Sequence, residues 1–69
     1  MDLKDILYLL GKKVKIIDTD DIQYIGYFLD YTPDFNNPEG EWSIELYSTK
    51  SSDSGMGFFE SDIKSIKIA

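Results

Sequence analysis

The apolar residues of this chain change their spacing at Gly11, and this change limits the fold more than any other feature. Before Gly11 the apolar side chains recur at helical spacing, at Leu3, Ile6, Leu7 and Leu10. Asp2 precedes them as a helix N-cap, and Gly11 suits the left-handed conformation that ends many helices. After Gly11 apolar residues alternate with polar ones, which is typical of strands with one buried face. The pattern predicts one short N-terminal α-helix followed by a sheet.

Five strands are expected after the helix, separated by segments rich in turn-forming residues. The alternation places them at residues 13–17, 23–31, 41–47, 56–60 and 63–68. Gly26 lies inside the second strand, where a glycine indicates a sharp bend or the close approach of another backbone. The segment 32–40 holds two prolines, two asparagines and a glycine and is expected to be a loop. The chain is therefore predicted to be mostly β, a small five-stranded barrel with one short α-helix.

The length of 69 residues allows a single domain that spans residues 1–69. The sequence contains neither Cys nor His, which excludes disulfides, thiolate metal sites and the commonest general base. Acid–base chemistry would rest on surface acids alone, so we expect no enzyme activity, no metal and no cofactor. No apolar run approaches the ~20 residues of a membrane span, so a cytoplasmic protein without a membrane partner is expected.

Charge is unevenly distributed along the chain. Residues 1–17 and 63–69 each carry a net charge of +2, whereas residues 18–62 carry −10. The first and last strands are neighbours in small barrels, so five lysines form a candidate basic patch: Lys12, Lys13, Lys15, Lys64 and Lys67. The alternative is that these lysines only protect strand edges from unwanted pairing. The net charge of −6 and the absence of Arg disfavour nucleic acid as a partner.

Several segments resemble the Sm-like family, which belongs to the SH3-like barrels. They are residues 7–14 at the helix exit, 24–28 in the second strand, 34–36 in the following loop, and 58–66 near the end. The chain is also similar to small Firmicute proteins with the same loop style. The resemblance implies an Sm-like barrel, assembly into rings and binding of single-stranded RNA. Where the family has a closing Ile-Arg-Gly triplet, this chain has Phe59, Glu60 and Ser61, so an acid replaces the cation that packs on the RNA base.

Both faces of the second strand carry apolar side chains. One face is expected to belong to the core, with Tyr24, Gly26 and Phe28. The candidate interaction surface combines the opposite face with one loop residue: Ile25, Tyr27, Leu29, Tyr31 and Phe35. Such a surface must be covered by the helix, by the long loop or by another subunit, and the sequence leaves these alternatives open.

Two groups of acids have simpler explanations than a cation site. The first lacks the spacing of a calcium loop and predicts a turn between the first two strands: Asp18, Asp20 and Asp21. The second is expected to be solvated loop charge: Asp30, Asp34, Glu39 and Glu41.

Three functions remain. The preferred one is a non-enzymatic Sm-like module that self-associates through strands four and five as a homo-oligomer. The alternative is a monomeric adaptor that binds a basic or proline-rich peptide between the acidic loops and Tyr27, Tyr31 or Trp42. The third is weak binding of single-stranded RNA through the lysine patch.

Overall fold

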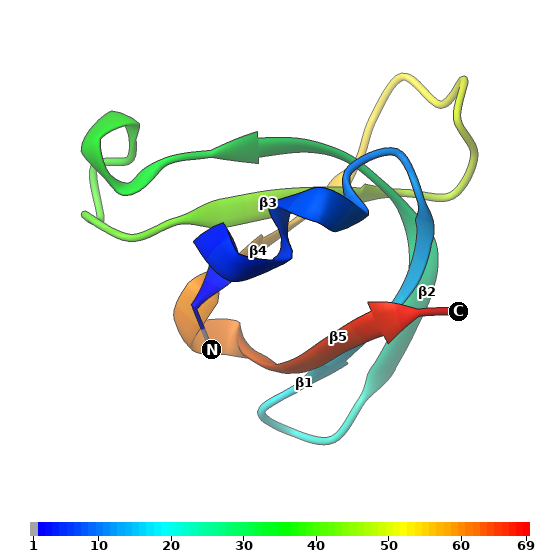
Figure 1. Ribbon diagram of the computed structural model, residues 1–69, viewed down its shortest axis with the longest axis horizontal. Coiled ribbons are helices and arrows are strands. Elements are labelled where there is room, and N and C mark those ends of the chain that lie inside the picture. The colour runs from blue at the N-terminus through cyan, green and yellow to red at the C-terminus, as the bar shows by residue number, and fades with distance from the viewer. Residues whose placement is uncertain (1) are drawn as a thin grey trace.

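The computed structural model describes residues 2–69 and contains five strands and three short helical segments (Figure 1). In chain order the segments are η1 (Leu3–Leu9), β1 (Lys13–Asp18), β2 (Gln23–Thr32), η2 (Asp34–Asn36), β3 (Ser43–Tyr47), β4 (Met56–Phe59), η3 (Glu60–Asp62) and β5 (Ile63–Ile68). The five predicted strands are all present, with ends that differ by at most two residues. The prediction of a mostly β protein with one short N-terminal helix is confirmed at this level.

All five strands form one antiparallel sheet in the order β4-β3-β2-β1-β5. The first half of β2 pairs with β1 and its second half pairs with β3. Figure 1 shows β2 curving around one side of the molecule, from the layer shared with β3 and β4 to the layer shared with β1 and β5. Strands β4 and β5 are the two edges of the sheet, and η3 connects them. Closure of the sheet into a barrel remains a prediction, because no pairing joins β4 to β5 within residues 2–69.

The bend of β2 depends on Gly26, as the sequence predicted. Gly26 is buried opposite Val14 of β1, at the place where β2 passes the end of β3. A Cβ atom at this position would lie 2.6 Å from the carbonyl oxygen of Tyr47 and 2.9 Å from Cγ of Leu46. Only glycine lets the two strands approach this closely without displacement.

The N-terminal helix η1 is a 3-10 helix, so the prediction of an α-helix is wrong in this respect. Its backbone bonds include Asp5 N–H to the Asp2 carbonyl and Leu10 N–H to the Leu7 carbonyl, both at 3.0 Å. With three residues per turn, side chains three positions apart fall in line, and Leu3, Ile6 and Leu9 are the buried ones. Leu10, expected on the buried stripe, is therefore exposed.

The two ends of η1 show how the helix is fixed. Asp2 occupies the N-cap position without a side-chain capping bond. Instead, Glu60 at the start of η3 accepts a 2.6 Å hydrogen bond from the N–H of Leu3. Gly11 follows the helix with φ of +89°, which confirms the predicted left-handed stop. A carboxylate distant in sequence thus anchors the helix across the sheet.

The core lies between the curved sheet and η1. Its buried members are Leu3, Ile6, Leu9, Val14, Ile16, Phe28, Ile44, Leu46, Phe58, Ile63 and Ile66. Tyr24 and Trp42 are half buried and pack against this cluster, with the Tyr24 ring edge-on to Phe58 at 5.0 Å. Trp42 therefore belongs with the core, as expected from its alternation.

Candidate functional site

The free edge of β5 offers unpaired backbone groups. The N–H of Ala69 donates to the carbonyl of Lys13 at 3.1 Å. This bond, together with the register, shows which residues of β5 have backbone groups bonded to β1. In an antiparallel pair these residues alternate, so the N–H and C=O groups of Ile66 and Ile68 point away from β1. No strand in the described part of the chain pairs with β5 on that side. The side chain of Ile68 is also 60% exposed.

The edge of β4 is shorter and partly closed by its own corner. Glu60 N–H donates to the Trp42 carbonyl at 2.9 Å, so by alternation Gly57 and Phe59 point their backbone groups away from β3. The N–H of Phe59 is taken by Oδ2 of Asp62 at 3.2 Å. The N–H of Gly57 thus remains as the outward donor of this edge.

The two edges differ in charge. Strand β5 carries Lys64 and Lys67, whereas β4 carries no charged side chain. Glu45 of β3 is directly opposite Gly57, and Asp53 lies in the loop that leads into β4. The edge of β5 is therefore basic, and the surroundings of the β4 edge are acidic.

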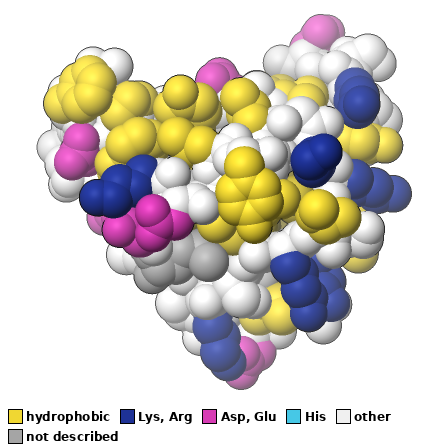
Figure 2. Space-filling model, viewed as in Figure 1, with side chains coloured by type: hydrophobic (Ala, Val, Ile, Leu, Met, Phe, Trp, Pro, Cys, Tyr) yellow, Lys and Arg dark blue, Asp and Glu magenta, His cyan; other side chains and the backbone are white. Residues whose placement is uncertain are grey.

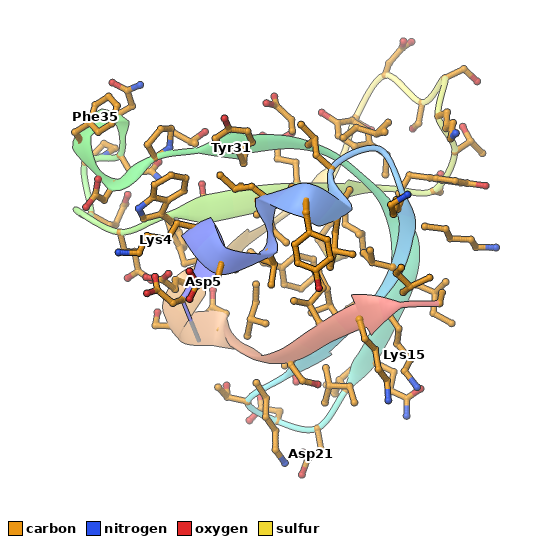
Figure 3. All side chains as sticks on the ribbon, in the orientation of Figure 1. Lys4, Asp5, Lys15, Asp21, Tyr31 and Phe35 are labelled. Atoms are coloured by element: carbon orange, nitrogen blue, oxygen red, sulfur yellow. The ribbon has the colours of Figure 1, made fainter. Side chains whose placement is uncertain are left out.

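The structure brings together only part of the predicted basic patch. Lys15 is directly opposite Lys67 in the β1–β5 pair, on the face away from buried Val14 and Ile16. Figure 3 shows Lys15 pointing away from the core. Lys13 is on the same face of β1, two residues from Lys15.

Lys64 and Lys12 do not join this group. Lys64 lies at the other end of β5, where Nζ contacts Oδ1 of Asp21 at 2.5 Å. Lys12 precedes β1, and its carbonyl accepts the N–H of Phe28 at 3.0 Å. The patch that the sheet assembles is thus Lys13, Lys15 and Lys67.

The predicted interaction surface is not a single face. Ile25 and Tyr27 lie opposite Lys15 and Lys13 and share the outward face of the sheet with them. The register shifts between Phe28 and Asp30, which marks a β-bulge at Leu29. Beyond the bulge Tyr31 is opposite buried Ile44 and packs against the core. The prediction that Tyr31 shares a face with Ile25 and Tyr27 is therefore wrong, because the bulge reverses the alternation.

Two aromatic residues beyond the bulge are also separated from that face. Tyr31 stacks on Trp42 with ring centroids 5.8 Å apart and planes 16° apart. Phe35 lies at the tip of the following loop, in η2, with 80% of its surface exposed, as labelled in Figure 3. Tyr27, in contrast, has the ammonium group of Lys50 at 5.5 Å from its ring centre. Tyr31 and Trp42 thus form one aromatic pair, and Tyr27 lies apart from it on the outward face.

Apolar side chains also gather on the face covered by η1, with charged groups at its borders (Figure 2). Tyr8 and Leu10 are exposed there because their side chains lie off the buried line of the 3-10 helix. Together with the outward face of β2, this apolar surface is a second area that a protein partner could bury.

A groove of about 420 Å³ lies where β2 separates from β3. Its walls come from the start of β2, the end of β3, the loop before β4 and the first residue of β4: Gln23, Tyr24, Ile25, Leu46, Tyr47, Ser48, Ser54 and Met56. Gly55 lies close to the Tyr47 ring of one wall, since a Cβ atom at Gly55 would be 2.9 Å from that ring. The volume falls within the range of small-ligand and peptide sites.

The two tyrosines of the groove sit in a negative field. Burial raises the pKa of Tyr24, and the nearby carboxylates of Asp18 and Asp20 raise it further. The hydrogen bond from the Tyr47 hydroxyl to Glu45 Oε2, 2.8 Å long, raises the pKa of Tyr47. Both hydroxyls therefore stay protonated to higher pH than an ordinary tyrosine.

The acidic segment after β1 forms a turn, as predicted. Oδ1 of Asp18 accepts the N–H groups of Asp20 and Ile22, each at 2.9 Å, and Asp21 has φ of 64°. Within residues 2–69 no group of three or more acids could hold a metal ion. No helix in the same range has the length and apolar character needed to cross a membrane.

No family model, curated protein or solved structure matches this chain. The resemblance to the Sm-like family remains a prediction based on the residues given above.

Sequence reasoning missed the groove, although a signal for it exists. The second strand was expected to be longer than the third, and β2 indeed has ten residues against five in β3. A long strand beside a short one must leave backbone groups without a partner on one side. The groove lies where β2 extends past β3.

Proposed function

We propose that this protein is a cytoplasmic, non-enzymatic interaction module that self-associates in the manner of Sm-like proteins. In this arrangement β5 of one copy adds to β4 of the next copy and extends the sheet from subunit to subunit. The observation that carries the proposal is the pair of open edges at opposite ends of one sheet. Repeated addition of this kind closes a ring when the rotation between neighbours divides a full turn, and a ring is what the resemblance to Sm-like proteins implies.

The chemistry of the edges supports this pairing over pairing of like edges. Ile66 and Ile68 present backbone groups on β5, and Gly57 presents them on β4. Lysines on β5 would approach the acidic surroundings of β4, whereas two β5 edges would bring lysines together. A 69-residue domain also gains stability from surface buried against a neighbour.

The test uses two variants that each block one edge. Gly57→Pro and Ile68→Pro remove an outward N–H without touching a bond to the neighbouring strand, as edge positions allow. Light scattering should give a multimer for the unaltered protein and a monomer for each variant alone. An equimolar mixture of the two variants should give a dimer, since one intact β5 edge meets one intact β4 edge.

Gly57→Ala and Ile68→Ala serve as matched controls because they retain the N–H, and both should still form the multimer. Circular dichroism checks that each variant is folded. A monomeric unaltered protein at micromolar concentration would refute the proposal. A mixture of folded variants that stays monomeric would refute pairing of β4 with β5.

A second candidate, weak binding of single-stranded RNA, is favoured by one observation. Lys15 and Lys67 are directly opposite each other, and like charges in this position are destabilising unless an anion lies nearby. Replacing both with Glu should abolish binding of a short oligonucleotide in a low-salt anisotropy titration. Lys4→Glu together with Lys64→Glu is the charge-matched control, because both lysines lie outside the patch, in contact with Asp2 and Asp21. An unaltered protein that does not bind at low salt would exclude this candidate.

A further inference from the structure

On one side of the start of β2, the backbone groups have no partner strand within residues 2–69. The N–H of Phe28 donates to Lys12 and the N–H of Asp18 donates to Ile22, which sets the alternation along the β1–β2 pair. Gln23 and Ile25 fall at the positions whose N–H and C=O groups point away from β1. On that side β3 pairs with β2 only from Tyr27 onward.

These unpaired groups open into the groove described above. Gln23 and Ile25 both line it, and Tyr47 and Met56 lie on the opposite wall. The side chains of Ile25 and Met56 are 59% and 52% exposed, so the rim of the groove is apolar on both sides. An extended peptide can bind to such a site. Its backbone would form hydrogen bonds with the free donors and acceptors, and its side chains would contact the apolar side chains beside them.

The charges near the groove favour a peptide with apolar side chains on one face and basic side chains on the other. Lys15 is directly opposite Ile25 on the outward face. Asp18 and Asp20 lie near Tyr24 at one wall. Glu45 does not line the groove, but it accepts a hydrogen bond of 2.8 Å from the hydroxyl of Tyr47 at the other wall. The carboxylates of Asp18 and Asp20 would attract a basic side chain of the bound segment.

We propose that this groove binds an extended basic segment of another protein, which adds to the Gln23–Ile25 stretch of β2 as a short extra strand. Apolar side chains of the segment lie beside Ile25 on the outward face, and its lysines or arginines, on the opposite face, lie near Asp18 and Asp20. The site is separate from the β4 and β5 edges, so it does not depend on self-association.

The experiment uses a synthetic six-residue peptide that alternates lysine and valine, with blocked ends. Amide exchange measured by NMR on the intact protein reports on the unpaired N–H groups directly. Saturating peptide should slow exchange of the Ile25 N–H by about tenfold or more, as expected for a group that becomes hydrogen-bonded. Binding should weaken strongly in about 1 M salt, where the screening length is about 3 Å.

Two altered peptides separate strand addition from simple charge attraction. The counterpart with glutamate in place of lysine should not bind. The counterpart with N-methylated valines keeps the charges but loses backbone donors, and it should leave exchange at Ile25 unchanged. Equal protection by either altered peptide would overturn the proposal.

Variants of the protein give an independent check. Ile25→Pro removes the outward N–H without breaking a bond to β1, and it should abolish peptide binding, while Ile25→Val should retain it. If Ile25→Pro does not fold, the N-methylated peptide decides the question. Protection at Gly57 or Ile68 in place of Ile25 would assign the peptide to the sheet edges and refute the groove. Concentration-dependent protection of Ile25 without peptide would identify a second copy as the occupant and refute a foreign peptide.

Discussion

Replacement of Gly26 by Ala tests the close approach of β2 and β3. In a strand, replacing glycine with alanine normally raises the free energy of unfolding by about 0.5–1 kcal/mol. Here the added Cβ would lie 2.6 Å from the backbone oxygen of Tyr47, an atom that cannot move without separating the strands. Forced overpacking of this kind costs about 1–3 kcal/mol. We therefore expect Gly26→Ala to destabilise the protein, against the ordinary preference of the strand.

The matched control is Gly57→Ala, because a Cβ at Gly57 meets nothing within 4 Å. A loss of about 2 kcal/mol corresponds to a fall in Tm of roughly 8–16 °C in a domain of this size. Thermal and urea unfolding followed by Trp42 fluorescence measure both variants. A Gly26→Ala variant as stable as the unaltered protein would refute the steric role of Gly26, and so would a Gly57→Ala variant destabilised to the same extent.

Three further substitutions test other parts of the structure. Glu60→Ala removes the carboxylate that accepts a hydrogen bond from the Leu3 N–H, so it should lower the free energy of unfolding by about 1–2 kcal/mol and speed amide exchange at Leu3. Unchanged exchange at Leu3 would show that Glu60 does not hold the helix in place. Because the pKa of Tyr47 is raised above its usual value of 10.0, the Tyr47 hydroxyl keeps its proton to higher pH in the folded state than in the unfolded state. The hydrogen bond to Glu45 therefore contributes stability below pH 10, and this contribution is lost as pH rises through the folded-state pKa. Glu45→Gln should therefore move the alkaline absorbance titration of Tyr47 to lower pH, and no movement would remove Glu45 as the cause. Phe28→Ala empties a fully buried site and should cost about 3–5 kcal/mol, enough to unfold so small a domain, which loss of near-ultraviolet circular dichroism would report.

The strands were predictable because alternation directly reflects which side chains face the core. Strand β5 was predicted with the ends that the structure has, and Gly11 and Gly26 were assigned the conformation and contact that they show. The helix type was not predictable from apolar spacing. Residues three apart and four apart both occur before Gly11, and only tertiary contacts decide that Leu9 is buried in place of Leu10.

The bulge in β2 was missed because a period of two assumes an unbroken ladder. Asp30 carries the signal that could have revealed it. Without a bulge, Asp30 would share the core face of Phe28 and bury an unpaired carboxylate, which is very unfavourable. The extra residue at Leu29 moves Asp30 to the outside and brings Tyr31 onto the core. An acid at a core position of an alternating strand is thus a sequence indication of a bulge.

The same strand that organises the core also creates the candidate peptide site. Strand β2 must pair with β1 at one end and β3 at the other, and the bend at Gly26 and the bulge at Leu29 direct these two pairings. A strand used in this way cannot be paired on both sides along its whole length, because β3 ends where β2 turns away. A longer chain could fill the gap with another strand, but here the only connection between β3 and β4 is a polar loop. The unpaired groups of Gln23 and Ile25 are therefore a consequence of building a strongly curved sheet from few residues, and an added peptide strand would complete the pairing that the chain itself leaves open.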